Sequence, residues 1–443
     1  MRKNIPYFVM AVIAIGLISY YVINDRKIIN NDDEERTVVV NSNCLPSDDV
    51  ESKKNERINV SIYMENSGSM DGYVNLNSEF KDALGKIIVK SNSFYSGVNL
   101  FFVNNSNIYD VQETQLKGDV NSFVSQLNSK TMKIGNTASS NINEIFKSVL
   151  EHTSKDTVSI LFSDFVYSIS KTNVESAISN AKNATMGAFL DAIKKDPNFS
   201  TIILQCQSAF QGMYYDRTGH GIAYQGTRPF YIFIMGSYDK LIDINKNLEL
   251  NSSSTGIPGL TNKYFLSTKT WNLDETTVQV VTTDYTNSDM IKAERDGMNI
   301  DFIKVGNDNL QYALALGVNN LFIDESYLCD PKNYKTDDSD IKITKAERVK
   351  SSAVLNEFPQ FKAPFAIHLS VPPSSQVPNL VIELENKIPS WVQASSVSDD
   401  LGTVPDSKTF AIYDLISGVY DAFHSQIKDK PIFKFEININ KYK

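Results

Sequence analysis

Buried-strand patterns alternate with helical patterns over residues 58–250, and this alternation restricts the fold more than any other feature of the chain. The strand candidates are short, nearly continuous apolar runs at residues 58–64, 98–103, 157–162, 201–206 and 230–235. Between them, apolar residues recur at the three- and four-residue spacing of amphipathic helices, at residues 80–88, 120–127, 142–150, 173–195 and 238–248. Continuous apolar strands indicate a sheet buried on both faces. We therefore predict an α/β domain with a doubly wound, mostly parallel sheet.

Oxygen-bearing side chains follow two of these strands. Glu65, Ser67 and Ser69 offer a carboxylate and two hydroxyls at alternate positions after the first strand. Asp164 follows the strand at 157–162, and Thr137 lies in a turn before a predicted helix. Doubly wound sheets bind ligands beyond the carboxyl ends of their strands, so we expect these five side chains to lie near one edge. Such donors suit Mg²⁺, Mn²⁺ or Ca²⁺ better than Zn²⁺ or copper.

The order and types of these residues resemble the von Willebrand factor A domain. That family carries Asp-x-Ser-x-Ser after its first strand, a Thr in a later loop and an Asp after a central strand. The matching residues here are E-N-S-G-S-M at 65–70, Thr137 and Asp164, and the resemblance covers residues 58–250. It implies a Rossmann-like fold with a metal-ion-dependent adhesion site. In such a site the five residues would bind a divalent cation, Mg²⁺ first, and an acidic group of a protein partner would complete the shell.

The chain departs from the family pattern at the first acid, because Glu65 stands where the family has Asp. Its side chain is one methylene longer, and Mg²⁺ requires near-ideal octahedral geometry while Ca²⁺ tolerates irregular shells. The change could alter the metal preference or abolish binding. The alternative is an ordinary strand-to-helix loop, in which the hydroxyls satisfy backbone amides and Ser69 or Asp71 caps the next helix.

The N-terminal residues predict a membrane anchor. Residues 6–24 are apolar and follow Arg2 and Lys3, and no small-residue cleavage site comes after them, which favours an uncleaved transmembrane signal anchor. Residues 25–57 are polar and charged, as in a tether that does not fold. We expect a single-pass membrane protein with the bulk of the chain outside the cytoplasm.

Residues 260–443 have a different pattern, after a connector rich in Ser, Gly and Pro at 252–259. Short strand candidates lie at 277–282, 341–343, 365–371, 380–384 and 433–439, with an amphipathic helix at 410–423. Their spacing predicts a β-rich, antiparallel and sandwich-like C-terminal domain. It resembles no family that we recognise.

An aromatic cluster before the strand at 230–235 has two interpretations. Phe210, Tyr214, Tyr215 and Tyr224 lie in a Gly-rich stretch. They could form an exposed recognition insertion near the predicted site, or a long hairpin or loop that packs its own aromatic rings. The sequence does not choose between them.

Composition excludes some classes of function. The net charge of -9 and the pI of about 5.2 argue against nucleic-acid binding. Three widely spaced cysteines do not predict a disulfide framework; Cys206 and Cys329 could pair, but two separate thiols are favoured. The four histidines lack metal-ligand spacing.

These observations favour a binding protein over an enzyme. We expect a membrane-tethered A-type domain that engages an acidic protein partner through a divalent cation. One alternative is a scaffold subunit of an envelope complex with a degenerate metal site. A metal-dependent phosphohydrolase is disfavoured, because it would need more acidic or His ligands than Glu65 and Asp164.

Overall fold

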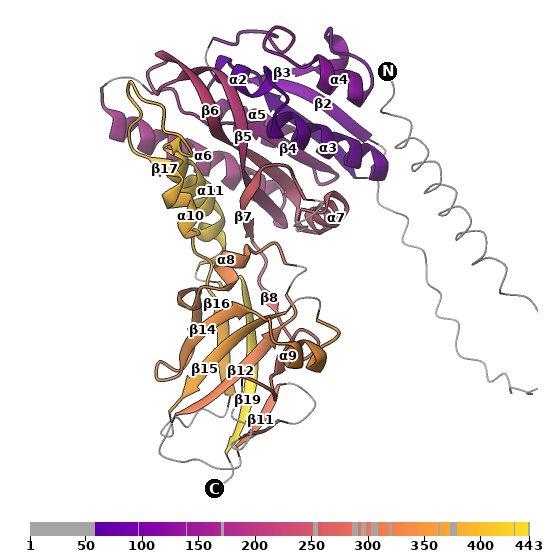
Figure 1. The fold of residues 1–443 in the computed structure, drawn as a ribbon. Coiled ribbons are helices and arrows are strands. Elements are labelled where there is room, and N and C mark those ends of the chain that lie inside the picture. The colour runs from indigo at the N-terminus through magenta and orange to yellow at the C-terminus, as the bar shows by residue number, and fades with distance from the viewer. Residues whose placement is uncertain are drawn as a thin grey trace, which may run out of the picture. The chain divides into compact units, whose positions relative to one another are not determined.

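A seven-stranded sheet organises the first part of the chain in the computed structural model (Figure 1). The structure describes residues 58–95, 97–138, 140–169, 172–250, 256–285, 291–293, 298–302, 309–318, 321–361, 364–372, 379–428 and 430–441. In spatial order the strands of this sheet are β3 (Asn107–Asp110), β2 (Gly97–Asn104), β1 (Asn59–Glu65), β4 (Thr157–Ser163), β6 (Gly221–Ser237), β5 (Phe199–Tyr215) and β7 (Leu260–Ser267).

The sheet is mixed rather than mostly parallel. β1 pairs in parallel with β2 and with β4. The pairs β2–β3, β4–β6, β5–β6 and β5–β7 are all antiparallel. The prediction of an α/β fold is therefore confirmed, and the prediction of mostly parallel pairing is wrong. Short turns at residues 105–106 and 216–220 join β2 to β3 and β5 to β6, and strands joined by a short turn pair in antiparallel.

Helices cover both faces of this sheet. Alternate residues of β1 point to opposite faces, so Ile62 and Met64 enter one apolar cluster and Tyr63 enters the other. The first cluster contains residues of α3 (Glu79–Phe94), α4 (Val120–Gln126) and α7 (Tyr238–Leu248). The second contains residues of α5 (Ile142–His152), α6 (Val174–Lys195) and α11 (Ile412–Ile427). Short turns at η1 (Gly68–Met70), α2 (Asp71–Val74) and η2 (Val111–Glu113) complete this part.

Two further sheets follow. One contains β10 (Ile291–Ala293), β11 (Asn299–Phe302), β19 (Phe433–Lys441), β16 (Asn379–Leu384) and β13 (Tyr334–Thr336), and β8 (Trp271–Asn272) pairs with β19. The other contains β14 (Lys342–Arg348), β15 (Phe365–Val371), β12 (Leu310–Leu316) and β9 (Val278–Val280). Buried residues of both sheets share one apolar cluster. The remaining helices here are α8 (Glu325–Leu328), η3 (Pro331–Asn333) and α9 (Ser352–Glu357).

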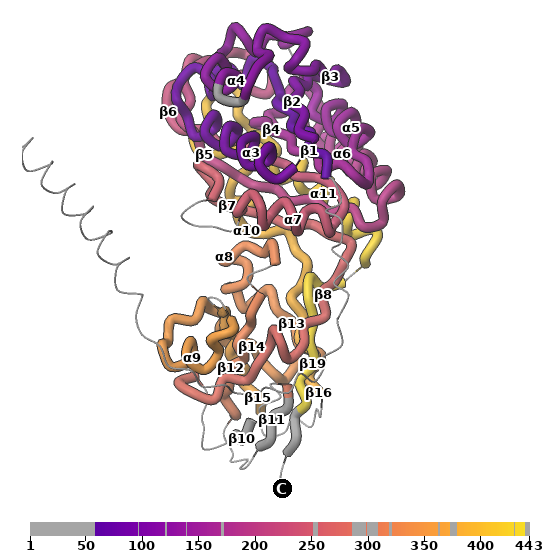
Figure 2. Tube along the Cα trace, turned by 90° about the vertical axis from the view of Figure 1, so that its right-hand side faces the viewer, coloured from indigo at the N-terminus to yellow at the C-terminus, as the bar shows by residue number. Residues whose placement is uncertain are grey.

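The chain then returns to the seven-stranded sheet. α10 (Ser390–Ala394) and the strand pair β17 (Ser396–Val397) and β18 (Thr409–Phe410) lead into α11, which packs beside α6 (Figures 1 and 2). The helix predicted at 410–423 is α11. Residues on both sides of the predicted boundary at 250–260 thus contribute to the first sheet and its cores, and all described residues belong to one compact unit, Glu56–Lys443.

The predicted anchor at 6–24 and tether at 25–57 lie outside the described residues. Within the part of the chain that the structure describes, no helix is long and apolar enough to cross a bilayer. Cys206 and Cys329 are both free thiols, which confirms the prediction of separate cysteines for this pair.

Candidate functional site

The loops after β1 and β4 come together because these two strands pair in parallel, so that their carboxyl ends lie at the same edge. Glu65 ends β1, and Asp164 directly follows β4. Both carboxylates are buried, with only 1% of Glu65 and 3% of Asp164 exposed. Two buried carboxylates at one sheet edge are costly unless their charge is balanced by a cation, a proton or hydrogen bonds.

Glu65 is held by hydroxyl groups on both of its oxygens. Ser67 donates to Oε1 at 2.7 Å, and Ser163 donates to Oε2. The Ser163 oxygen also accepts from the amide of Phe165 at 2.8 Å. The side chain of Glu65, one methylene longer than Asp, therefore contacts both its own loop, at Ser67, and the end of β4, at Ser163.

Ser69 connects the first loop to the second carboxylate. Its hydroxyl lies 3.0 Å from that of Ser67 and hydrogen-bonds to Asp164. Burial, and then the charge of Glu65, raise the pKa of Asp164 to about 7, although the Ser69 contact, the amide of Val166 and the charge of Arg228 oppose the shift. An added positive charge near Asp164 would therefore stabilise its ionised form.

The third predicted loop also reaches this edge, but through its backbone. The amide of Gly68 donates to the carbonyl of Thr137 at 3.1 Å. Asn66 secures the same approach, because its side-chain amide donates to the carbonyls of Met132 and Ile134, each at 2.9 Å. The structure thus brings the side chains of Glu65, Ser67, Ser69 and Asp164 together. Thr137 lies beside them and contacts Gly68 through its main-chain carbonyl.

A buried arginine, Arg228, lies close enough to Asp164 for their charges to interact. Arg228 of β6 is only 1% exposed, and its guanidinium lies 4.4 Å from the ring centroid of Tyr214. Nη1 donates to the carbonyls of Pro405 and Asp406, and to that of Lys408 at 3.0 Å. Its Nε and Nη2 atoms make no hydrogen bond to the described residues. Its charge helps to offset that of Asp164.

The site offers hydroxyl and carboxylate oxygens, the ligand types that hard divalent cations bind. Oxygens on adjacent vertices of an octahedral Mg²⁺ shell lie about 3.0 Å apart when the metal–oxygen distance is about 2.1 Å. The Ser67 and Ser69 oxygens have this separation in the structure. Among the described residues, no group of three or more His, Cys, Asp or Glu side chains could hold a metal, so any site here depends on hydroxyl ligands.

Sequence patterns did not identify Asn66, Ser163 or Arg228. Ser163 ends a buried strand directly after the apolar run Ile160–Phe162, and this break in the pattern was an available signal. The contacts of Asn66 and Arg228 lie 66 and 177 residues away along the chain, and nothing local indicates them.

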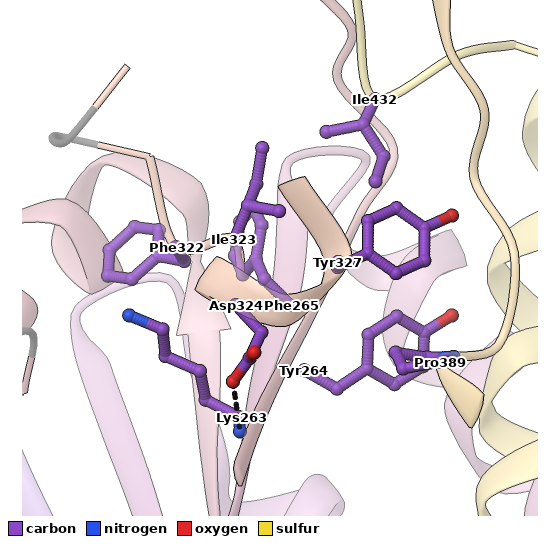
Figure 3. A pocket seen from close by; sticks show the side chains of 9 residues that line it. All are labelled: Lys263, Tyr264, Phe265, Phe322, Ile323, Asp324, Tyr327, Pro389 and Ile432. Carbon is purple, nitrogen blue, oxygen red and sulfur yellow. Dashed lines mark hydrogen bonds between the residues drawn. The ribbon is translucent and has the colours of Figure 1, made fainter. Parts of the chain in front are cut away.

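A small hollow lies between β7 and the loop before α8 (Figure 3). The rings of Tyr264, Phe322 and Tyr327 line it, and the backbone amide of Lys263 donates to Asp324 at 3.4 Å. Its free volume of about 20 Å³ has room for about one water molecule. It is too small for an organic ligand and contains none of the predicted site residues.

Comparisons with protein-family models, curated proteins and solved structures find no match to this chain.

Proposed function

We propose that this chain is a membrane-tethered binding protein whose α/β part is a doubly wound, von Willebrand factor A-type domain. In this proposal it engages a protein partner through a divalent cation, Mg²⁺ first, with Mn²⁺ or Ca²⁺ as substitutes. The observation that carries the proposal is the junction of three loops at one sheet edge, where Glu65, Ser67, Ser69 and Asp164 share hydrogen bonds and Thr137 is held by Gly68.

The charge of the site supports binding rather than catalysis. Ser67 and Ser69 would contribute neutral oxygens, and Glu65 and Asp164 would balance the charge of the cation. Only two carboxylates, partly offset by Arg228, leave a divalent cation able to attract another acidic ligand. A carboxylate of a partner protein supplies that ligand. The rings of His152 and His368 hydrogen-bond elsewhere, to Ser148 and Glu347, rather than to these residues as a general base would.

The later sheets would form the sandwich-like second domain, and the N-terminal residues would hold the protein in a membrane with its bulk outside the cytoplasm. In this arrangement the tether places the cation site away from the bilayer, where a partner in the same compartment can reach it.

The test is the melting temperature of the full chain in Mg²⁺, Mn²⁺, Ca²⁺ or EDTA. Because a ligand that binds only the folded state stabilises it, by about 2.7 kcal/mol at a hundredfold excess over Kd, the wild type should melt several degrees higher in Mg²⁺ than in EDTA. The double variant Ser67→Ala, Ser69→Ala should lose this shift. The exposed serines Ser93 and Ser125, changed together to Ala, provide a matched control that keeps it. Identical curves for the wild type in all four conditions would refute the cation site.

A second measurement separates the proposed function from that of a structural scaffold. Partners recovered from solubilised membranes with the full chain should be released by EDTA if the cation carries the contact. Retention of the same partners in EDTA would favour the scaffold.

A further inference from the structure

The β5–β6 hairpin extends beyond the rest of the sheet, beside α2 (Figure 1). β7 pairs with β5 only as far as Cys206, and β4 pairs with β6 only from Tyr231 onward. Past these points the two strands pair with each other up to Tyr215 and Gly221. We call this outer part, residues 207–215 and 221–229, the arm.

One side of the arm packs directly on residues 66–74, which include η1 and α2 and which we call the site loop. A Cβ atom on Gly212 would lie 2.8 Å from Cα of Gly72, so the two backbones touch. Tyr73, the next residue, donates from its hydroxyl to the carbonyl of Pro229 at 2.5 Å. At the end of β5 the ring of Tyr215 covers Gly68, whose added Cβ would lie 3.3 Å from the ring. The arm therefore lies against the loop that carries Ser67 and Ser69.

The end of the arm is anchored by the segment at 399–408. Asp400, which is fully buried, accepts from the Tyr214 hydroxyl and from the amide of Arg217 at 3.1 Å. Asp216 accepts from the amide of Gly402 at 2.9 Å. With contacts to the site loop and to this segment, the arm is pre-organised, and a pre-organised surface loses less entropy when it binds.

The exposed surface of the arm combines apolar and amide groups. Met213 and Tyr215 lie on the same strand face, and both reach across Gly221, where an added Cβ would meet them at 2.9 and 3.3 Å. Met213 is 40% exposed, which is unusual for a large apolar side chain in this structure. An adjoining open hollow of about 520 Å³ is lined by Gln211, Gln225 and Asp71, the first residue of α2 in the site loop. The hollow thus adjoins the site loop through Asp71.

We propose that the arm is the specificity-determining surface and that it binds an extended peptide segment of the partner. The inference rests on the proposed function, which places an acidic residue of that segment at the cation. A neighbouring apolar side chain packs on Met213 and Tyr215, because a flexible thioether adapts to varied apolar shapes. Gln211 and Gln225 each carry a donor and an acceptor, which match the amide and carbonyl of the segment's main chain.

The hollow has few charged side chains, as expected for a surface that binds the main chain and apolar side chains of a peptide rather than a free ion. Among the described residues that line it, Asp71 alone is charged, and Lys133 lies 3.7 Å from that carboxylate. The acidic residue of the segment is therefore selected at the cation, and the arm selects the residues that flank it.

The test uses a displayed library of random short peptides, selected on the full chain in Mg²⁺ and eluted first with EDTA and then with acid. Peptides enriched in the EDTA fraction should share an Asp or Glu close to an apolar residue. A synthetic peptide with the enriched sequence should bind the variant Met213→Ser, Gln225→Ala about tenfold more weakly than the wild type. The matched control is Val89→Ser, Gln126→Ala, which changes an exposed apolar residue and an exposed amide on α3 and α4, and it should bind the peptide as the wild type does.

Two outcomes would overturn the inference: no enrichment of acidic–apolar peptides in either fraction, or equal peptide affinity of the wild type and the arm variant. The Mg²⁺-dependent melting shift is measured on the same samples and reports the cation site separately. It should be equal in the wild type and both variants if the arm selects peptides and does not bind the metal. A shift without arm-dependent peptide binding would leave the proposed function intact and refute the role of the arm. Arm-dependent peptides that elute only with acid, from a protein without a Mg²⁺ shift, would support the arm and refute the cation.

Discussion

The hydroxyl of Ser67 donates to Oε1 of Glu65 at 2.7 Å. Ser163, which is 98 residues from Glu65 along the chain, donates to Oε2 of the same carboxylate. A shorter Asp at position 65 cannot reach both hydroxyls without movement of the loop. We therefore expect Glu65→Asp to leave one buried hydroxyl unsatisfied and to lower the free energy of unfolding in EDTA by about 1–3 kcal/mol. Urea denaturation measures this change.

The control for that prediction is Glu113→Asp, the same shortening at an exposed position in η2. It should change the stability by less than about 0.5 kcal/mol. Equal effects of the two substitutions would show that the contacts between Glu65 and the two serines do not stabilise the fold.

The raised pKa of Asp164 predicts how stability depends on pH without metal. Burial, followed by the charge of Glu65, raises this pKa from 3.8 to about 7 in the folded protein. A carboxyl with a raised folded pKa contributes stability that is fully present below its unfolded pKa and is lost as the pH rises through the folded one. In EDTA, the free energy of unfolding should therefore fall as the pH rises from about 4 to about 7.

Asp164→Asn is the control for this pH dependence, because the amide does not titrate. In EDTA, the difference in unfolding free energy between the wild type and this variant should change across the same pH window. A constant difference would contradict the prediction. The lowered pKa of Asp216, about 2 in the folded state, acts in the opposite direction and only below this window.

The sequence predicted most helices and central strands because their side chains carry a clear period. Residues 238–248 and 365–371 form α7 and β15 with the predicted bounds. β7 was missed because it follows a Ser, Gly and Pro connector that is typical of a domain boundary, although its residues pair with β5 in the first sheet. Its place depends on long-range pairing, which local composition does not encode.

The candidate site was predictable only where its residues end predicted strands. Glu65 and Asp164 both follow apolar strands, and parallel pairing of β1 with β4 brings them to one edge. The aromatic residues at 210–224 could not be assigned from sequence. The structure resolves them as part of a long hairpin in which Phe210 and Tyr214 are buried, whereas Tyr215 is partly exposed beside the site. Which aromatic residues of β5 are buried depends on how α2 and the segment at 399–408 pack against this strand.

The Tyr214 hydroxyl should stabilise the arm far more than that of Tyr224. Tyr214 donates to the fully buried Asp400, whereas Tyr224 donates to Asp406 at an exposed position, at 3.1 Å. Tyr214→Phe leaves a buried carboxylate short of a donor, so we expect a loss of about 1–3 kcal/mol of unfolding free energy. Tyr224→Phe removes the same atom and should cost less than about 0.5 kcal/mol. Denaturant midpoints compare the two, and equal shifts would show that the contact with Asp400 does not anchor the arm.

Gly72 and Gly187 predict opposite effects of the same substitution in two helices. A Cβ atom on Gly72 would lie 2.3 Å from Cζ of the buried Phe210, whereas nothing lies within 4 Å of a Cβ on Gly187. Gly187→Ala should raise the free energy of unfolding by about 0.5–1 kcal/mol, because Ala is the better helix former. Gly72→Ala should lower it by about 1–3 kcal/mol or more, since the ring or the helix must move.

A second substitution identifies the cause of that loss. Phe210→Leu removes the atoms that the new methyl group would meet, so the double variant Gly72→Ala, Phe210→Leu should be more stable than the sum of the single changes predicts, by about 1 kcal/mol. Urea denaturation of the four proteins in EDTA provides the cycle. Additive losses would mean that the backbone conformation at position 72, and not the Phe210 ring, requires glycine. The close packing of the arm on the site loop would then not explain the glycine at this position.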